Sequence, residues 1–246
     1  MVTSPGMRIA VLSDIHANLP ALDAVLADAG PVDGIWHLGD VVGYGPDPNG
    51  VVARLRDVGA TGVRGNHDAA ACGGPEIDWF NADARRAMEW TRTTIDGPSV
   101  EWLSALPERR VLEGCELVHG SPREPLWEYI VSVPIARANL AVLTTPFGLY
   151  GHTHLPMVFA EHDGAVDQIE PAEGSTFRVE GRRALINPGS VGQPRDGLLT
   201  ASFLILDTDI GQCTWQRVAY DIGAVQGEMR NAGLPARLVE RLSYGL

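Results

Sequence analysis

Short apolar runs that end abruptly in glycine or polar residues shape the first part of the chain, and helical patterns separate them. The first run covers residues 8–13 and ends in Ser13-Asp14, after which leucine and valine recur at helical spacing over 19–26. Residues 34–38 and 62–64 repeat the strand pattern, with a helical pattern over 51–58 between them. This alternation predicts β-α-β-α-β order and an α/β fold.

The later part of the chain has a different pattern. Residues 77–95 and 100–106 are expected to be helices, the first with Trp79, Phe80, Met88 and Trp90 as packing residues. The segments expected to be strands are 116–119, 149–151, 157–160, 183–186, 202–207 and 214–218, and helices are expected over 222–231 and 236–242. No repeat or linker divides the chain, and the acidic stretch 164–174 is interpreted as a surface excursion, so 1–246 is predicted to form one domain.

The charge composition excludes several classes of function. The chain has 19 basic and 31 acidic residues, a net charge of −12, and such a surface repels polyanions. We therefore expect no binding of duplex nucleic acid or of a membrane surface. All the basic residues are arginine. A chain without lysine has no Walker A phosphate loop, Schiff-base lysine or pyridoxal-phosphate anchor.

The three cysteines, Cys72, Cys115 and Cys213, are widely spaced and form no C-x-x-C pair, which argues against a disulfide framework and a zinc ribbon. The first residues lack the basic start and apolar stretch of a signal peptide. No window approaches the ~18 apolar residues of a membrane helix. We expect a soluble, uncleaved protein of the cytoplasm; the sequence carries no signal for an oligomeric state.

Potential metal ligands follow almost every predicted strand. They are Asp14, His16, Asp40, Asn66, His67, His119, His152 and His154. In open α/β sheets ligands bind outside the carboxyl ends of the strands, so these side chains are expected to converge. Asp14 and His16 stand two residues apart, as do His152 and His154, and on an extended segment each pair points to one face.

Each of these residues alone has an ordinary structural explanation, since an aspartate after a strand is usually a helix cap and a single histidine is usually structural. The set favours function, because five of the seven histidines lie in or beside glycine-rich strand ends. His37, within the second predicted strand, is expected to be structural. His162 is assigned to the acidic surface excursion.

Five motifs occur in order: Asp14-x-His16, Gly39-Asp40, Gly65-Asn66-His67-Asp68, Val118-His119-Gly120 and Gly151-His152-Thr153-His154. Together they resemble the signature of the calcineurin-like metallophosphoesterases, over residues 8 to about 196. The stretches 13–18, 39–46 and 187–192 are similar to the small bacterial phosphodiesterases of that superfamily. The resemblance implies a four-layer α/β/β/α sandwich of two mixed β-sheets flanked by helices, with a centre of two divalent metal ions.

The resemblance also implies roles for the motif residues. The first metal ion would take Asp14, His16, Asp40 and His154, and the second would take Asp40, Asn66, His119 and His152. Such ligands accept Mn, Fe, Zn, Ni or Co, and a hydroxide between two ions roughly 3.5–4 Å apart would hydrolyse the ester. His67 would contact the phosphate and protonate or stabilise the leaving oxygen, and Asp68 would orient the His67 ring.

Three residues in neighbouring loops are candidates for substrate binding. Arg123 and Arg195 could grip phosphate through the guanidinium fork, with a surface salt bridge as the alternative for each. Tyr44 follows Asp40 closely enough to reach the site, although packing in a Gly-Pro-rich turn also explains it. Residues 126–130, which include Trp127 and Tyr129, are expected to form part of a wall facing the substrate.

These features predict a metal-dependent phosphoesterase, specifically a phosphodiesterase that acts on a small phosphate ester such as a nucleotide. A phosphomonoesterase or nucleotide phosphatase of the same superfamily, a nuclease for short substrates, and a catalytically silent metal- or phosphate-binding module are the alternatives. A protein phosphatase is disfavoured, because residues 39–45 lack the arginine of G-D-x-V-D-R-G. Ser190 lies in a segment that fails the first position of the G-x-S-x-G nucleophile elbow, which argues against a serine hydrolase.

Overall fold

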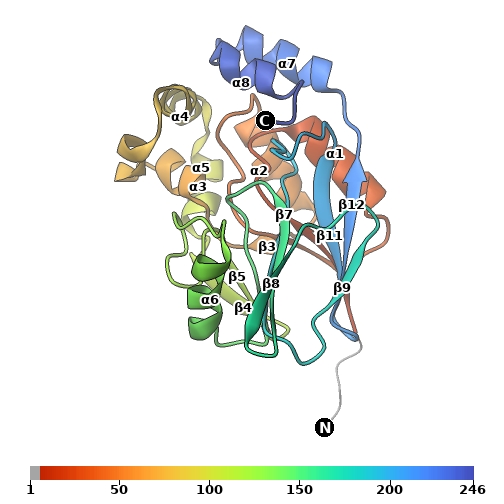
Figure 1. The fold of residues 1–246 in the computed structure, drawn as a ribbon. Helices are drawn as coiled ribbons and strands as arrows, with labels where there is room; N and C mark the ends of the chain where they lie inside the picture. The colour runs from red at the N-terminus through yellow and green to blue at the C-terminus, as the bar shows by residue number, and fades with distance from the viewer. Residues whose placement is uncertain (1–5) are drawn as a thin grey trace.

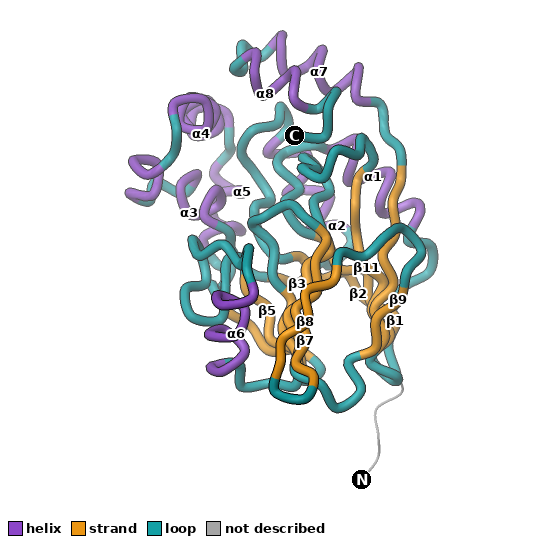
Figure 2. Tube along the Cα trace, in the orientation of Figure 1, coloured by secondary structure: helices purple, strands orange, loops and turns teal. Residues whose placement is uncertain are grey.

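Two six-stranded mixed sheets form the centre of the computed structural model, which describes residues 6–246 (Figure 2). The first sheet contains, in spatial order, β3 (Thr61–Gly62), β2 (Gly34–His37), β1 (Arg8–Leu12), β11 (Ala201–Asp207), β12 (Gln212–Val218) and β9 (Thr176–Arg178). The second contains β4 (Arg109–Leu112), β5 (Cys115–Val118), β6 (Phe147–Leu149), β10 (Ala184–Pro188), β7 (Pro156–His162) and β8 (Ala165–Ile169). Parallel pairing joins β1, β2 and β3 in one sheet and β5, β6 and β10 in the other.

Helices cover the outer faces of the two sheets. The helices of the described residues are α1 (Leu19–Asp28), α2 (Pro48–Asp57), α3 (Asn66–Ala71), α4 (Ala82–Thr94), α5 (Gly97–Ser104), α6 (Val133–Val142), α7 (Ile222–Asn231) and α8 (Ala236–Arg241), with the 3₁₀ helix η1 (Pro75–Trp79) before α4. Helix α1 contacts β11 and β12 of the first sheet, and α6 contacts β8 and β10 of the second. The layers are therefore helix, sheet, sheet and helix, which confirms the predicted architecture.

Strand β1 shows why the sheets lie inside. Successive side chains of a strand point to opposite faces. Ala10 and Leu12 pack in the hydrophobic cluster that α1 and α2 cover, whereas Ile9 and Val11 pack in the cluster between the two sheets. Because both faces are buried from Ile9 onward, the strand is apolar from Ile9 to Leu12.

The helices begin where the sequence offers a side-chain cap. The side chains of Asn18, Asp47, Asn81, Asp96 and Asp221 accept hydrogen bonds from backbone N–H groups in the first turns of α1, α2, α4, α5 and α7. Such a bond satisfies one of the N–H groups that have no partner within the helix. Within residues 6–246 no helix has the length and apolar character of a membrane span.

The last two helices, α7 and α8, pack together at one end of the molecule (Figure 1). Val225 and Met229 of α7 and Leu238 of α8 share a hydrophobic cluster with Ala84 of α4 and with Tyr44. The C-terminal helices are thereby held beside the loop that follows β2.

The structure differs from the predicted elements in several places. The expected helix over 77–95 is interrupted at Phe80-Asn81, because Asn81 caps α4 and the preceding residues form η1. Helix α6 was not predicted, and the segment 66–71 forms the short helix α3. The acidic stretch 164–174 contains the edge strand β8, most of whose residues are exposed.

The two histidines outside the motifs lie where the sequence predicts. His37 is fully buried in β2, neither of its ring nitrogens has a hydrogen-bond partner within residues 6–246, and its ring lies 5.6 Å from that of Trp102. His162 is the exposed last residue of β7, and its Nε2 atom lies 3.4 Å from Oδ2 of Asp163.

Candidate metal centre

The predicted metal ligands converge where the two sheets meet. Loops after β1, β2 and β6 carry Asp14 with His16, Asp40, and His152 with His154; Asn66 begins α3, and His119 directly follows β5. All seven side chains are buried. The first sheet thus supplies four of the ligands and the second supplies three.

Unusual backbone conformations aim these side chains. Asp14, His16, Asp40, His152 and His154 all have φ between 49° and 65°, in the left-handed region. This conformation costs a residue with a Cβ atom about 1–2 kcal/mol of conformational free energy. Strain of this kind persists only where surrounding contacts impose it, and it clusters at functional sites.

Two of the motif glycines are required by close approach. A Cβ on Gly65 would lie 2.1 Å from an Asp40 carboxylate oxygen, and a Cβ on Gly151 would lie 2.0 Å from the Ser13 hydroxyl. The glycines of the Gly-Asn-His-Asp and Gly-His-Thr-His motifs therefore let the ligand loops pack against each other.

The ligand atoms form two clusters. In the first, the Asp14 Oδ1 atom lies 3.3 Å from Nε2 of His154, which lies 3.1 Å from Nε2 of His16. In the second, Nε2 of His119 lies 3.0 Å from Nδ1 of His152 and 3.0 Å from Oδ1 of Asn66.

Asp40 joins the two clusters. Its Oδ2 atom lies 3.7 Å from Nε2 of His16 and 3.3 Å from Nε2 of His119. Its other oxygen accepts a hydrogen bond from the backbone N–H of His67 at 2.9 Å. One carboxylate oxygen is thus anchored to the chain while the other faces both clusters.

Hydrogen bonds on the far side of three rings indicate that the clusters suit cations. The Nδ1 atoms of His16, His119 and His154 face backbone carbonyls, of Val42, Leu38 and Gln193 respectively. A carbonyl can only accept, so Nδ1 carries the proton and the Nε2 lone pair points into the cluster. Asp14 Oδ1 is buried without a hydrogen-bond partner among the described residues. Converging lone pairs and an unpaired carboxylate oxygen are the donor set that a divalent cation requires.

The electrostatics of the centre follow from burial and from Asp40. Burial raises the pKa of the Asp14 carboxyl to about 7 and lowers the pKa values of His16, His152 and His154 well below the usual histidine range. Burial also opposes charge on His119, but the adjacent Asp40 carboxylate outweighs it and raises the pKa of His119 to about 9. A proton on His119 balances Asp40, and a cation bound there would replace that proton.

A cavity of about 240 Å³ opens over the clusters. Its lining includes Asp40, Asn66, His67, His152 and His154 from the motifs, together with Tyr44, Trp79, Phe80, Asn81, Trp127, Tyr129 and Arg195. The ring of Tyr129 stacks on the ring of His152 at 3.8 Å, and Trp127 lies 5.1 Å from Trp79. Trp127 and Tyr129 therefore form part of the cavity wall that the sequence predicts for residues 126–130.

Comparison with known proteins accounts for this arrangement. The calcineurin-like phosphoesterase superfamily domain matches residues 7–211. The chain belongs to the calcineurin-like phosphoesterase superfamily. It is therefore a phosphoester hydrolase of a metal-dependent family, and its Asp and His clusters are groups that could hold metal ions.

Three similar proteins illustrate the relationship. The crystal structure of a metallophosphoesterase from Sphaerobacter thermophilus has a TM-score of 0.90 and 45% identity, covering 98% of this chain and 100% of its own. An uncharacterised protein of Methanocaldococcus jannaschii is 37% identical over 96% of this chain and 98% of its own length. The phosphodiesterase YfcE of Escherichia coli is 29% identical over 83% of this chain and 89% of its own length.

His67 lies within this phosphoesterase centre, where one of its ring nitrogens and the ligand atoms of His16 and Asp40 all lie within 4.8 Å of one another. Its ring lies 4.4 Å from that of Tyr44 and 4.5 Å from that of Phe80, and its Nδ1 atom lies 3.2 Å from the Met88 sulfur. Burial lowers the pKa of His67 to about 4, although the Asp40 charge opposes this shift. The ring is therefore neutral at pH 7 in the protein alone and offers an N–H donor.

The structure gives Asp68 a different position from the predicted one. Its carboxylate accepts hydrogen bonds from the backbone N–H groups of Val41 and Val42 at 2.8 and 3.1 Å and of Gly65 at 2.9 Å, and none from the His67 ring. Asp68 therefore ties the loop after β2 to the start of α3. Asp68 thus holds these two segments together through their backbone N–H groups and does not orient the His67 ring.

Two of the three predicted substrate-binding residues reach the cavity. Arg195 and Tyr44 line it, with the guanidinium carbon of Arg195 6.0 Å from the Tyr44 ring centroid. Arg123 does not line it, because its exposed guanidinium bonds to the Glu128 carboxylate. The salt bridge that was the alternative explanation for Arg123 is what the structure contains.

Trp79, Phe80 and Asn81 are site residues that the sequence reasoning missed. Trp79 and Phe80 were expected as packing residues of one continuous helix, yet Trp79 is 67% exposed and both line the cavity. The signal that could have found them is Asn81 itself, a strong helix-capping residue in the middle of the expected helix. A helix start at Asn81 places both aromatics ahead of α4, with Trp79 at the end of η1 and Phe80 between η1 and α4.

Proposed function

We propose that this member of the superfamily is a phosphodiesterase for small phosphate esters that works with two divalent cations, one in each ligand cluster. The observation that carries the proposal is the pair of buried clusters, Asp14 with His16 and His154, and Asp40 with His119 and His152, joined by the single Asp40 carboxylate. A donor set of nitrogen and oxygen atoms leaves the choice among Mn, Fe, Zn, Ni and Co to the availability of each metal. We take manganese as the first candidate to test.

The chemistry divides between the cations and the chain. When bound, divalent cations supply Lewis-acid stabilisation of phosphoryl oxygens and lower the pKa of water toward neutrality. The neutral His67 ring would donate a hydrogen bond from its N–H group to the leaving oxygen. Arg195 would bind a non-bridging oxygen of the phosphate through its guanidinium.

The shape of the cavity favours a diester over a monoester. A diester carries an organic group on both sides of the phosphorus, and aromatic side chains bind such groups by apolar contact. Trp79, Phe80 and Trp127 line one part of the cavity, whereas Tyr44 and Arg195 belong to another part that continues into a second cavity. The similarity to the phosphodiesterase YfcE of Escherichia coli supports the same choice.

The experiment that tests this function starts from protein stripped with a chelator and reloaded with Mn²⁺. Hydrolysis of bis(p-nitrophenyl) phosphate and of p-nitrophenyl phosphate is then compared, with bound metal measured on the same samples. We expect diester turnover that requires metal and exceeds monoester turnover. Faster monoester turnover would assign a phosphomonoesterase, and two bound ions with no turnover of either ester would favour the silent binding module.

A His67→Ala variant separates catalysis from metal binding. Because we assign His67 to the leaving oxygen rather than to a cation, we expect both ions to remain bound while turnover falls by roughly 10²–10³, the range for a lost hydrogen-bond donor to the transition state. His162→Ala, at the exposed end of β7, is the control and is expected to keep metal and turnover. Loss of metal in parallel with activity in His67→Ala would make His67 a ligand.

We also propose that the protein works in the reducing cytoplasm. Its three cysteines are all free, and burial raises the pKa of the Cys213 thiol to about 12, which keeps that thiol unreactive. Fractionation of cells that express the tagged chain tests this location.

A further inference from the structure

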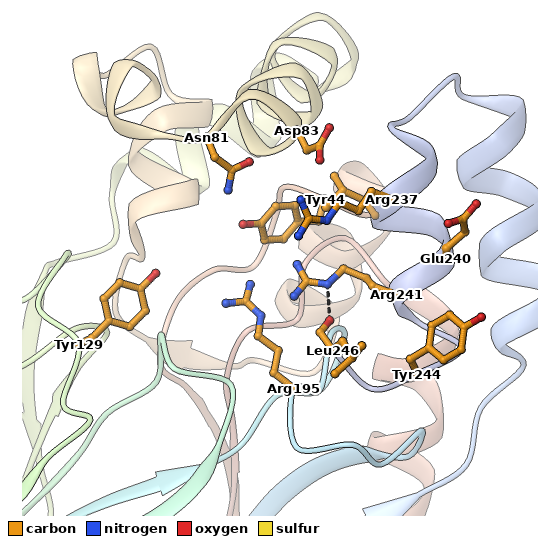
Figure 3. Close-up of a pocket in the computed structure, with 11 residues that line it drawn as sticks. Tyr44, Asn81, Asp83, Tyr129, Arg195, Arg237, Glu240, Arg241, Tyr244 and Leu246 are labelled. Atoms are coloured by element: carbon orange, nitrogen blue, oxygen red, sulfur yellow. Dashed lines mark hydrogen bonds between the residues drawn. The ribbon is translucent and has the colours of Figure 1, made fainter.

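A second cavity, of about 440 Å³, adjoins the cavity over the metal clusters (Figure 3). Tyr44, Asn81, Tyr129 and Arg195 line both cavities, so the two spaces are continuous around these four side chains. The remaining lining of the second cavity consists of Asp83 from α4 and of Arg237, Leu238, Glu240, Arg241, Tyr244 and Leu246 from the C-terminal segment.

Three guanidinium groups, those of Arg195, Arg237 and Arg241, line this second cavity, and Figure 3 shows them on neighbouring parts of its wall. Among residues 6–246, none of the three lies within 4.0 Å of an Asp or Glu carboxylate oxygen, although eight other arginines form ion pairs with such groups. Arg241 does bond through Nε to the main-chain oxygen of Leu246. The cavity also contains two side-chain carboxylates, of the half-buried Asp83 and the exposed Glu240. Its side chains thus sum to a positive charge in a chain whose net charge is −12.

The donors of these arginines are only partly used. Arg195 donates one hydrogen bond, to the Gln193 side chain at 2.9 Å, and its buried Nε atom has no partner within the described residues. Arg241 donates from Nε to the Leu246 carbonyl oxygen, which leaves its other N–H groups free for a ligand. Burial, and then the charge of Arg195, lowers the pKa of Arg241 to about 10. An anion bound between the two arginines would offset both the desolvation of Arg241 and its repulsion by Arg195.

We propose that Arg237 and Arg241, together with Arg195, form a subsite for a second phosphate group on the substrate. This inference rests on the proposed phosphoesterase site, because the subsite opens directly into it. Guanidinium forks match phosphate oxygens with two parallel hydrogen bonds, and a space of this size holds a nucleoside-sized group with its phosphate. The preferred substrate is therefore a phosphodiester whose organic part carries a further phosphate.

The test compares two substrates that differ by one phosphate. These are the p-nitrophenyl ester of thymidine 5′-phosphate and the same ester with an added 3′-phosphate. We expect the added phosphate to raise kcat/KM of the Mn²⁺-loaded protein by about tenfold or more, as charge-assisted hydrogen bonds provide. In Arg237→Gln and in Arg241→Gln we expect most of this gain to be lost. Arg230→Gln, an exposed arginine on α7 outside the cavity, should retain the gain.

A binding measurement separates failure of the subsite from failure of the proposed function. Thymidine 3′,5′-bisphosphate and thymidine 5′-phosphate are titrated into the metal-loaded wild-type protein and into Arg237→Gln, whose exposed position makes misfolding a minor concern. Tighter binding of the bisphosphate that is lost in Arg237→Gln supports the subsite even if neither ester is hydrolysed. Equal binding of the two nucleotides to the wild type, or an undiminished preference for the bisphosphate in Arg237→Gln, would overturn the subsite while leaving the phosphodiesterase proposal intact.

Discussion

At the scale of single residues, the centre depends on ligands held in conformations that their residue types disfavour. Asp14, His16 and Asp40 occupy the left-handed region, and backbone hydrogen bonds impose it: the N–H groups of Asp14 and His16 donate to the carbonyls of Gly39 and Asp40 at 3.1 and 2.9 Å. The loops after β1 and β2 therefore hold each other in place before any cation binds.

Asp40→Asn is the sharpest substitution at this scale. Asparagine can still accept the hydrogen bond from the His67 backbone, but it removes the negative charge that faces both clusters. We expect both ions to bind at least about tenfold more weakly, so that the metal content after dialysis falls toward zero. Metal analysis and titration measure this.

Asp23→Asn, on the exposed side of α1, is the matched control and should keep its metal. Retention of two tightly bound ions by Asp40→Asn would show that Asp40 does not join the clusters.

His37 predicts a pH dependence of stability that is separate from the metal centre. Burial, followed by the charge of Arg110, lowers the pKa of His37 to about 3 from its unfolded value of 6.5. Between pH 6.5 and pH 3 the unfolded chain binds a proton at this position and the folded chain does not. The free energy of unfolding therefore falls as the pH drops, by up to about 1.4 kcal/mol per pH unit from this residue.

In His37→Leu this contribution is absent. Urea unfolding between pH 6 and pH 4 should show a pH slope that is smaller than that of the wild type by this amount, whatever the substitution does to stability at pH 7. Identical slopes in the two proteins would mean that His37 is protonated in the folded state.

At the scale of helices and strands, prediction succeeded where the signal is local. The strands that carry the ligands and the capped helices α1 and α7 lie close to their predicted positions, because apolar runs and capping residues act within a few residues. Helix α6 and the edge strands β4, β8 and β9 were missed. Strand β8 is mostly exposed and pairs only with β7, so its sequence has little apolar patterning.

The hairpin between β4 and β5 offers a stabilising substitution. Its turn residues Glu113 and Gly114 both have positive φ, 46° and 72°, a conformation that Asn-Gly adopts more readily than Glu-Gly. Since the Glu113 side chain is exposed, we expect Glu113→Asn to raise the free energy of unfolding by roughly 0.5–1 kcal/mol. Thermal unfolding should show a rise of about 1–4 °C in Tm.

The hairpin between β7 and β8 supplies the comparison. Its turn already has the favourable pair Asp163-Gly164 at φ 48° and 78°, so Asp163→Asn should change Tm little. A destabilised Glu113→Asn protein would show that the glutamate makes a contact that outweighs its backbone strain.

At the scale of the whole molecule, the metal centre connects the two sheets. The first sheet supplies the loops of Asp14, His16, Asp40 and Asn66, and the second supplies those of His119, His152 and His154, so cations bound there would link both halves of the sandwich. Ligands that bind only the folded state stabilise it, by about 2.7 kcal/mol at a concentration one hundred times Kd.

Removal of metal should therefore lower Tm by several degrees, and Mn²⁺ should restore it. Calorimetry on stripped and reloaded protein measures the change, and Asp40→Asn should show a much smaller one. Equal Tm values for the stripped and the loaded protein would mean that the bound ions do not stabilise the packing of the two sheets.

The sequence by itself was enough to predict, through its motifs, which residues gather at the candidate metal centre and, through the family resemblance, the layers of the fold. Each ligand lies at or just beyond the end of a strand or beside a motif glycine, so its position follows from short-range patterns. Only the tertiary structure decided the partners of side chains that meet across long separations in the chain. It turned Asp68 toward the backbone of Val41, 27 residues earlier in the chain, and placed Trp79 over the cavity.

The same holds for Arg237 and Arg241. Their helix, α8, reaches the site because α7 and α8 pack against α4 and Tyr44 through an apolar cluster. Such packing depends on the combined shape of several elements, and no local pattern of residues encodes it.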